Sequence, residues 1–424
     1  MGDANLGKDR LISRGVPAAS PKTGIVLSGG GMRGAYEVGT LVAIMEVLGC
    51  RPEGEPVFRV LSGTSVGAIN AAYLAANAHR GDHGIPDLAA IWSSLQLDAH
   101  LRVRPFGLMR WPRRIRSAAR SLMTPESAGT SLLDASALEL VVRRSIEWER
   151  LHENVAMSRV SALLIAALHV ASGRTTIFAE VAPTSQYRPS PDPRRRTSLE
   201  PIEAEHVLAS AAIPLLFPTR RVGAHYYCDG GLRFNTPIAP AIRAGAERLL
   251  IISVRHEVTA SEAEALEALV DGEGADLSPS FLVGKLLNAL LLDPVAYDLG
   301  VLNRLNQLME LLEETLSQED LERVQRVLYR TRGAPYRRLK HLVFTPSLDL
   351  GKVAGDYIRA NITPSELGPL ARYLTQRAVR EAPQQEADWA SYLLFDGGFA
   401  ARLLDLGYED GKARREEILR FFDD

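Results

Sequence analysis

Short apolar runs alternate with helix-like segments in the first part of the chain. Ile25–Leu27 is an apolar run bounded by glycine, which is typical of a buried strand, and a helix-like pattern follows it as far as Leu48. Val57–Leu61 is a second strand candidate, and after a sharp turn the small residues of Val66–Ala76 predict another helix. The order strand, helix, strand, helix predicts an α/β fold, in which helices cover both faces of a mainly parallel central sheet.

The later pattern adds more strands and then becomes mostly helical. Pro183–Pro201 contains five prolines, so we expect an exposed loop with little regular structure there. Ile202–Ala212 predicts a helix, and from about Glu262 to the end of the chain the pattern is mainly that of helices. Further strands are predicted at Val160–Val170, Arg174–Val181, Tyr226–Cys228, Leu249–Val254 and Leu339–Phe344.

These patterns predict one core with additions. We expect residues 1–21 to be a flexible leader and residues 22–255 to form the core. The core carries inserts near 99–125 and 183–201. Residues 256–424 are expected to form a mostly helical extension that packs on the core.

The composition is that of an ordinary globular protein. A hydrophobic fraction of 46% with 24% charged residues excludes a mainly disordered, collagen-like or coiled-coil chain. The 49 basic and 51 acidic residues give a net charge of -2, which offers no global argument for nucleic acid binding. Cys50 and Cys228 are too few for a disulfide scaffold, and no cluster of His, Cys, Asp or Glu has the spacing of metal ligands. We therefore expect no metal and no cofactor.

No segment has the character of a membrane span or of a secretory signal. The longest largely apolar stretch, Ala162–Ala171, is too short to cross a bilayer. The first twenty residues contain no apolar core of the kind found in signal peptides. The sequence therefore favours a cytoplasmic protein, with contact to a membrane surface left open, and it sets no oligomeric state.

One insert concentrates positive charge. Arg102–Arg120 contains seven arginines interleaved with Phe106, Trp111 and other bulky apolar residues, and it contains no acidic residue. Arginine beside aromatic side chains suits an anionic membrane surface, where guanidinium groups pair with lipid phosphates. The alternative is a solvated basic face whose apolar residues pack on the core. No nucleic-acid-binding motif accompanies the insert, so we expect no nucleic acid partner.

A candidate nucleophile follows the second predicted strand. The sequence GTSVG from Gly63 to Gly67 has the form G-x-S-x-G and lies between an apolar strand and a helix. A serine in such a turn is held exposed, and the positive end of the following helix points at Ser65, where negative charge develops in acyl transfer. The structural alternative is a serine that caps a helix after a glycine turn.

A glycine-rich segment follows the first predicted strand. GGGMRG at 29–34 matches G-x-G-x-x-G, but a dinucleotide site would need an acidic residue at the end of the second strand, which ends instead in Leu61, Ser62 and Gly63. Consecutive glycines expose backbone N–H groups that can form an oxyanion hole beside a neighbouring nucleophile. Three roles stay open for Arg33 within this segment: it adds positive charge beside the oxyanion, binds a phosphate, or pairs with a carboxylate.

A candidate base follows a later strand. Asp229 stands in the sequence CDGG, directly after the apolar strand at Tyr226–Cys228. A desolvated carboxylate beside the serine can accept its proton, whereas the structural alternative is a turn aspartate of the kind common in Asp-Gly sequences. His206 and His225 also lie near the motifs and allow a Ser-His-Asp triad, but neither stands in a glycine-framed turn, which favours surface or packing roles.

The three motifs stand in one order and together resemble the patatin-like phospholipase family, whose members are lipid acyl hydrolases with a Ser-Asp dyad. The resemblance covers residues 22–255. It implies that Ser65 is the nucleophile and that Asp229 accepts its proton. The other site residues that it implies are Gly29, Gly30, Gly31 and Gly34 around the oxyanion, Arg33 at the family's basic position, and Gly63, Gly67, Gly230 and Gly231 as the frame of the motifs.

The resemblance also implies a reaction. Ser65 attacks a carboxylic ester of a phospholipid or another lipid, an acyl-enzyme forms, and water releases the fatty acid without any need for calcium. This is the chemistry of a phospholipase A or a lysophospholipase. Two alternatives stay open: an acyltransferase that uses the same dyad, and a lipid-binding or interaction protein without catalysis. The arginine-rich insert, the proline-containing loop and the helical region from 262 depart from the family's pattern, which leaves substrate choice and regulation open.

Overall fold

The structure is a computed structural model that describes residues 22–49, 55–82, 84–96, 102–103, 127–128, 133–134, 136–257, 261, 264, 288–289, 295–332, 338–361 and 388–423. The predicted leader at 1–21 and most of Arg102–Arg120 lie outside the described residues, so both predictions remain as stated.

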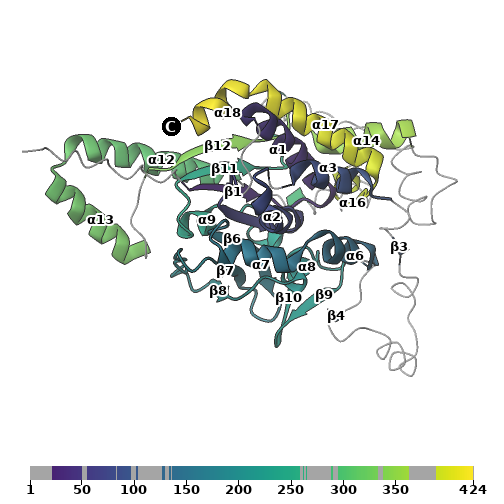
Figure 1. The fold of residues 1–424 in the computed structure, drawn as a ribbon, viewed down its shortest axis with the longest axis horizontal. Coiled ribbons are helices and arrows are strands. Elements are labelled where there is room, and N and C mark those ends of the chain that lie inside the picture. Colours follow the sequence, from purple (N-terminus) through teal and green to yellow (C-terminus); the bar gives the residue numbers. More distant parts are fainter. Residues whose placement is uncertain are drawn as a thin grey trace, which may run out of the picture.

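The centre of the molecule is a sheet of ten strands in the order β12-β11-β1-β2-β6-β10-β9-β4, with β7 paired to β6 and β8 paired to β7 (Figure 1). Its strands are β1 Thr23–Leu27, β2 Val60–Thr64, β4 Ser127–Ala128, β6 Ala162–His169, β7 Thr175–Val181, β8 Arg195–Leu199, β9 Thr219–Val222, β10 His225–Asp229, β11 Arg248–Ile252 and β12 Lys340–Phe344. Two further short strands, β3 Arg102–Val103 and β5 Leu133–Asp134, pair with each other.

The strand directions confirm the predicted fold class. The run β12-β11-β1-β2-β6 is parallel throughout, whereas β7, β10, β9 and β4 continue it in antiparallel pairs. The motif-bearing turns after β1 and β2 therefore open at the same edge of the sheet, because parallel strands end on the same side.

The central strands β1, β2 and β11 are buried on both faces, and their side chains alternate between two apolar clusters. Ile25 and Leu27 of β1 face one cluster, and Val26 faces the other. The first cluster is covered by α1, α2, α7, α8 and α17, and the second by α9 (Figure 1).

The helices are α1 Gly34–Leu48, α2 Val66–Ala76, α3 Ile85–Ser93, α6 Ser136–Ser145, α7 Trp148–Ala156, α8 Ala204–Ser210, α9 Ile238–Arg243, α12 Val295–Thr315, α13 Gln318–Arg332, α14 Leu350–Asn361, α16 Asp388–Leu393, α17 Gly397–Ala413 and α18 Arg415–Phe422, with 3-10 turns η1 Gly31–Arg33, η2 Ala78–Arg80 and η3 Gly230–Leu232.

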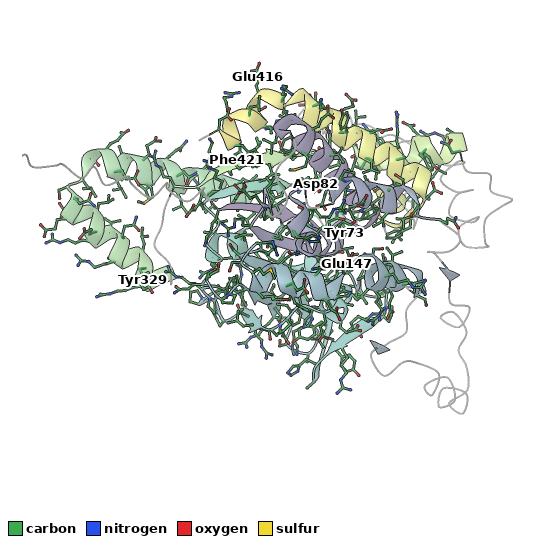
Figure 2. The ribbon with its side chains drawn as sticks, in the orientation of Figure 1. Tyr73, Asp82, Glu147, Tyr329, Glu416 and Phe421 are labelled. Carbon is green, nitrogen blue, oxygen red and sulfur yellow. The ribbon has the colours of Figure 1, made fainter. Side chains whose placement is uncertain are left out.

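The C-terminal region contacts the sheet and its covering helices. β12 pairs in parallel with β11, and α17 lies along α1, where Gly39 and Gly407 let the two backbones approach closely. The hairpin of α12 and α13 instead extends away from the sheet, with Tyr329 on α13 (Figure 2). We propose that residues 256–424 elaborate the core rather than form a second enzyme.

Two sequence predictions need correction. The proline-containing loop was expected to lack regular structure, but its end, Arg195–Leu199, forms β8 and pairs with β7. The last proline before Pro201 is Pro193, so the residues after it keep their backbone donors, and the open edge of β7 offers partners. The second strand runs over Val60–Thr64 instead of Val57–Leu61. Ser62 and Gly63 are weak strand formers, yet their backbones pair with both β1 and β6.

Among the described residues, no helix combines the length and the apolar character needed to cross a membrane.

Candidate active site

Two strands meet end to end along β6, and their meeting point brings Ser65 and Asp229 together. On β6, Ala166 lies opposite Thr64 of β2, and the next residue, Ala167, lies opposite Asp229 of β10. The ends of β2 and β10 therefore converge on adjacent positions of one strand. Ser65, which follows Thr64, donates a hydrogen bond of 2.7 Å from Oγ to Oδ2 of Asp229. Both residues are buried, with 4% and 0% of their surface exposed.

Ser65 occupies a sharp turn between β2 and α2. Its φ of 54° and ψ of -123° are rarely adopted by a residue that carries a side chain, so the backbone is strained at this position. The N–H of Ser65 donates a 2.8 Å hydrogen bond to Oγ of Ser210, and that hydroxyl donates to the carbonyl of Ala166 at 2.6 Å. The flanking glycines leave the space that the turn needs, because a Cβ on Gly63 would overlap the carbonyl of Gly67.

The carboxyl group of Asp229 has two hydrogen-bond donors. Its Oδ2 accepts from Ser65, and its Oδ1 accepts a bond of 2.7 Å from the N–H of Gly231. Complete burial disfavours the charged carboxylate and raises the pKa of Asp229 to about 7, although both hydrogen bonds act to lower it. A carboxyl group with this pKa can take up and release a proton near neutral pH. Gly230 lies against the carbonyl of Ala166, where no side chain would fit.

The glycine segment after β1 is held beside Ser65 by Asn235. The side chain of Asn235 donates from Nδ2 to the carbonyl of Gly29 at 3.0 Å, and the main-chain carbonyl of Asn235 accepts from the N–H of Gly29 at 3.3 Å. A Cβ placed on Gly29 would lie 3.1 Å from Cβ of Ser65, so the two backbones are in close contact. Gly34, at the start of α1, packs in the same way against the side chain of Val66.

Three backbone N–H groups near Ser65 are candidate donors to a ligand. Among the residues that the structure describes, the N–H groups of Gly30, Gly31 and Val66 have no hydrogen-bond acceptor. Gly31, Ser65 and Val66 all line the same pocket. Val66 is the residue after the serine and the first residue of α2, where the helix carries partial positive charge. This arrangement matches the donor pattern of an oxyanion hole in which the residue after the nucleophile contributes one N–H.

Arg33 does not line the pocket. It is 4% exposed, its Nε donates to Oγ of Ser391 at 2.8 Å, and its guanidinium group lies 4.0 Å from the ring centre of Tyr392. Its Nη2 is 3.8 Å from Oδ1 of Asp388. The positive charge of Arg33 is therefore directed at α16.

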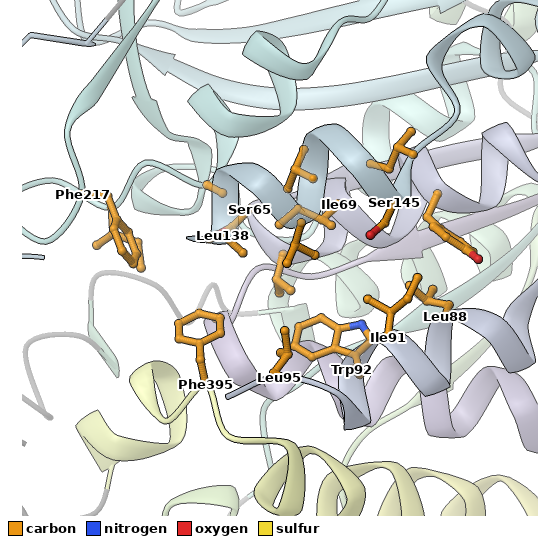
Figure 3. A pocket seen from close by; sticks show the side chains of 18 residues that line it. Ser65, Ile69, Leu88, Ile91, Trp92, Leu95, Leu138, Ser145, Phe217 and Phe395 are labelled. Carbon is orange, nitrogen blue, oxygen red and sulfur yellow. The ribbon is translucent and has the colours of Figure 1, made fainter. Parts of the chain in front are cut away.

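The pocket beside Ser65 is almost entirely apolar. Figure 3 shows Ile91, Trp92 and Leu95 on one side of it, and Ile69 and Leu138 on the other. No Asp, Glu, Lys or Arg is among the described residues that line it. The other lining residues are Gly31, Val66, Tyr73, Leu88, Val141, Val142, Ser145, Ile146, Ala211, Ile213, Phe217 and Phe395. A pocket of this lining suits a hydrocarbon chain.

The other reactive side chains lie outside this arrangement. His206 on α8 accepts at Nδ1 from the N–H of Glu203, and its ring packs edge-on against Phe178. His225 is exposed and packs edge-on against His169. Burial raises the pKa of the Cys228 thiol to about 11, so this thiol is neutral, and Cys50 lies outside the described residues. Among the described residues, no three His, Cys, Asp or Glu side chains are grouped as metal ligands.

Sequence reasoning overlooked several residues of this site. Ser210, Val66 and the side-chain role of Asn235 were not singled out, although Asn235 follows the Asp-Gly-Gly motif closely enough to draw attention. The apolar pocket was also missed, because its walls come from α2, α3, α6 and the segment after α16, which are distant in sequence.

The chain is similar in sequence to one protein family. A family model described as patatin-like phospholipase matches residues 25–242. Two solved structures are similar over most of the chain. VipD from Legionella pneumophila has 14% sequence identity and a TM-score of 0.32, with 92% of this chain and 67% of that chain covered. Human GIVD cytosolic phospholipase A2, in complex with methyl gamma-linolenyl fluorophosphonate, has 14% identity and a TM-score of 0.37, with 95% and 59% covered.

This chain thus spans about two thirds of VipD and three fifths of the human enzyme. No curated protein sequence matches it. The family model covers more than half of the chain and includes all three motifs, from the glycine segment to Asp229. The chain belongs to the patatin-like phospholipase family.

Proposed function

We propose that this protein is a serine lipid acyl hydrolase of the phospholipase A or lysophospholipase type. The observation that carries the proposal is the 2.7 Å hydrogen bond from Ser65 Oγ to Asp229 Oδ2 at the wall of an apolar pocket. The substrate is a phospholipid or another lipid ester whose acyl chain enters the pocket. The family membership supports the same class of reaction.

The first step forms an acyl-enzyme. Asp229 accepts the proton of the Ser65 hydroxyl as Oγ attacks the ester carbonyl, and the N–H groups of Gly30, Gly31 and Val66 stabilise the oxyanion. The tetrahedral intermediate then collapses, the proton on Asp229 passes to the leaving alkoxide, and the lysolipid or alcohol departs. A pKa of about 7 lets Asp229 perform both transfers near neutral pH.

The second step releases the acyl group. Water takes the place of the departed alcohol, gives a proton to Asp229 and attacks the acyl carbonyl, so that fatty acid leaves and Ser65 recovers its proton. An alcohol of another lipid can attack in place of water, and the same site then acts as an acyltransferase.

The features of Ser65 and Asp229 oppose a purely structural role. Ser65 is held in a strained conformation and Asp229 is a buried carboxyl group, and each costs folding free energy. A lipid-binding protein without catalysis would gain nothing from keeping both. Contact with an anionic membrane through Arg102–Arg120 is a separate proposal, because most of that segment lies outside the described residues.

A panel of phospholipids, lysophospholipids and neutral glycerides, with products identified by mass, tests this function. We expect free fatty acid from at least one lipid class and no product with Ser65→Ala. Addition of an acceptor alcohol separates the two enzyme classes, because an acyltransferase forms the new ester in preference to fatty acid. Full activity of Ser65→Ala would overturn the assignment.

A further inference from the structure

The glycine segment beside Ser65 is in buried contact with α16, a helix more than 350 residues later in the chain. Gly31 has a φ of 57°, and the carbonyl of Tyr392 lies where its Cβ would be. Two residues on, Arg33 places its guanidinium group over the ring of Tyr392 and donates to the hydroxyl of Ser391 at 2.8 Å. The family model ends at residue 242, so this contact joins the family's oxyanion segment to a part of the chain outside the match.

α16 is itself fixed from its other side. Asn288 donates from Nδ2 to Oδ2 of Asp388 at 2.7 Å and accepts from the hydroxyl of Tyr392 at 2.8 Å. Phe395, shortly after the helix, lines the pocket that contains Ser65 (Figure 3). The segment 388–395 therefore touches both the oxyanion segment and the pocket.

A glycine segment cannot fix its own conformation. Residues without Cβ have many accessible backbone conformations, and N–H groups stabilise an oxyanion only if they are already oriented toward it. Arg33 supplies a strong constraint on this segment. A buried guanidinium group is costly without partners, and Ser391, Tyr392 and Asp388 provide them only while α16 stays in place.

We propose that Arg33 is a positioning residue and that α16, through Ser391 and Tyr392, holds the oxyanion donors of Gly30 and Gly31 in their working orientation. This inference rests on the proposed function of the Ser65 site. It replaces a direct contact of Arg33 with a substrate phosphate, because the guanidinium group is buried and already has Ser391 and Asp388 as partners.

The test uses the full-length protein and the variants Arg33→Met, Ser391→Ala and Tyr392→Leu. kcat and KM are measured with p-nitrophenyl butyrate, which has no phosphate, and with a phospholipid. We expect kcat to fall by about ten- to a hundredfold on both substrates, with KM changed less than about twofold, because lost oxyanion donors act on the transition state.

A second readout separates positioning from general loss of structure. A long-chain alkyl trifluoromethyl ketone adds to the Ser65 hydroxyl, whose proton passes to Asp229, and forms a tetrahedral oxyanion. Its inhibition constant is expected to rise by the same factor by which kcat/KM falls. Arg248→Met is the matched control, because Arg248 is a buried arginine that donates to the carbonyl of Phe421 in α18, away from the site. This control is expected to lower the melting temperature and to leave kcat within about twofold.

The outcomes are distinct. A loss confined to KM for the phospholipid, with butyrate hydrolysis unchanged, would mean that Arg33 binds the phosphate and would overturn the proposal. Wild-type kcat and inhibitor affinity in all three variants would overturn it too. If Arg33→Met does not fold, Ser391→Ala removes only the acceptor of Nε and carries the same test. Failure of the wild type to hydrolyse either ester would instead contradict the proposed function.

Discussion

The backbone N–H of Ser65 donates a hydrogen bond of 2.8 Å to the hydroxyl of Ser210, which in turn donates a hydrogen bond to the carbonyl of Ala166. The side chain of Ser210 thus links the turn that carries Ser65 to β6, the strand along which β2 and β10 meet. Both backbone groups are buried, and the structure offers them this hydroxyl as their shared partner.

Ser210→Ala is predicted to damage catalysis and stability together. Loss of the hydroxyl leaves a buried N–H and a buried carbonyl unpaired, which costs about 1–3 kcal/mol of unfolding free energy. Ser65 is then less well held, and kcat should fall by about ten- to a hundredfold. Urea unfolding and steady-state kinetics measure the two effects. Ser93→Ala, which removes an exposed helical hydroxyl, should change neither, and an unaffected kcat in Ser210→Ala would refute the role of this contact.

The pH dependence of activity follows from Asp229. The carboxylate form accepts the Ser65 proton, and burial raises the pKa of this group to about 7. We predict that kcat/KM of the free enzyme falls about tenfold for each pH unit below 7 and levels off above it. A pH–rate profile with an uncharged ester measures this. A plateau that extends down to pH 5 would contradict a base with this pKa.

The ionisation of Asp229 also affects the stability of the fold. The charged form that activity needs is the form that lowers stability. Because the folded-state pKa of Asp229 lies above its ordinary value of 3.8, the folded protein binds this proton more tightly than the unfolded chain does. The stability that the protonated Asp229 contributes is therefore complete below about pH 4 and is lost as the pH rises through 7. Asp229→Asn lacks the proton but keeps the shape, so its stability relative to wild type should rise by a few kcal/mol between pH 4 and pH 8. Urea unfolding at both pH values measures it, and a pH-independent difference would rule the linkage out.

The pocket predicts selectivity for acyl chain length. Leu138 on α6 lines the pocket, whereas Leu140 on the same helix is 47% exposed and does not. Leu138→Trp fills space that a long acyl chain needs, so kcat/KM for a palmitoyl ester should fall at least about tenfold, a loss of about 1.4 kcal/mol in transition-state binding. Hydrolysis of a butyryl ester should change little. Leu140→Trp is the matched control, and equal losses on both esters would argue against an acyl-chain site.

The sequence predicted the parts of the site that are encoded locally. Glycine motifs after β1, β2 and β10 identified the turns, because each turn needs close backbone approach that few other residues allow. The mainly parallel sheet with helices on its faces followed from alternating apolar runs and helix-like segments. What remained out of reach depends on register and long-range contacts: the meeting of Thr64 and Asp229 on β6, and the contact of Arg33 with α16.

The edge strand β8 also could not be predicted from the pattern of apolar and polar residues. β8 begins just after a proline-rich stretch and has mostly polar residues, so its sequence resembles a loop. Its strand conformation depends on the free edge of β7, which is a property of the folded sheet and not of the segment itself.

The roles of Ser65 and Asp229 are tested most directly by labelling the protein with an alkyl fluorophosphonate. In this reaction the Ser65 oxygen bonds to phosphorus and fluoride leaves. Peptide mass spectrometry should find one alkylphosphonyl group, located on the peptide that contains Ser65. We predict slow labelling in Asp229→Asn, because the proton acceptor is gone, and none in Ser65→Ala. Labelling of a different residue, or undiminished hydrolysis after complete labelling of Ser65, would contradict the claim that Ser65 and Asp229 perform the reaction.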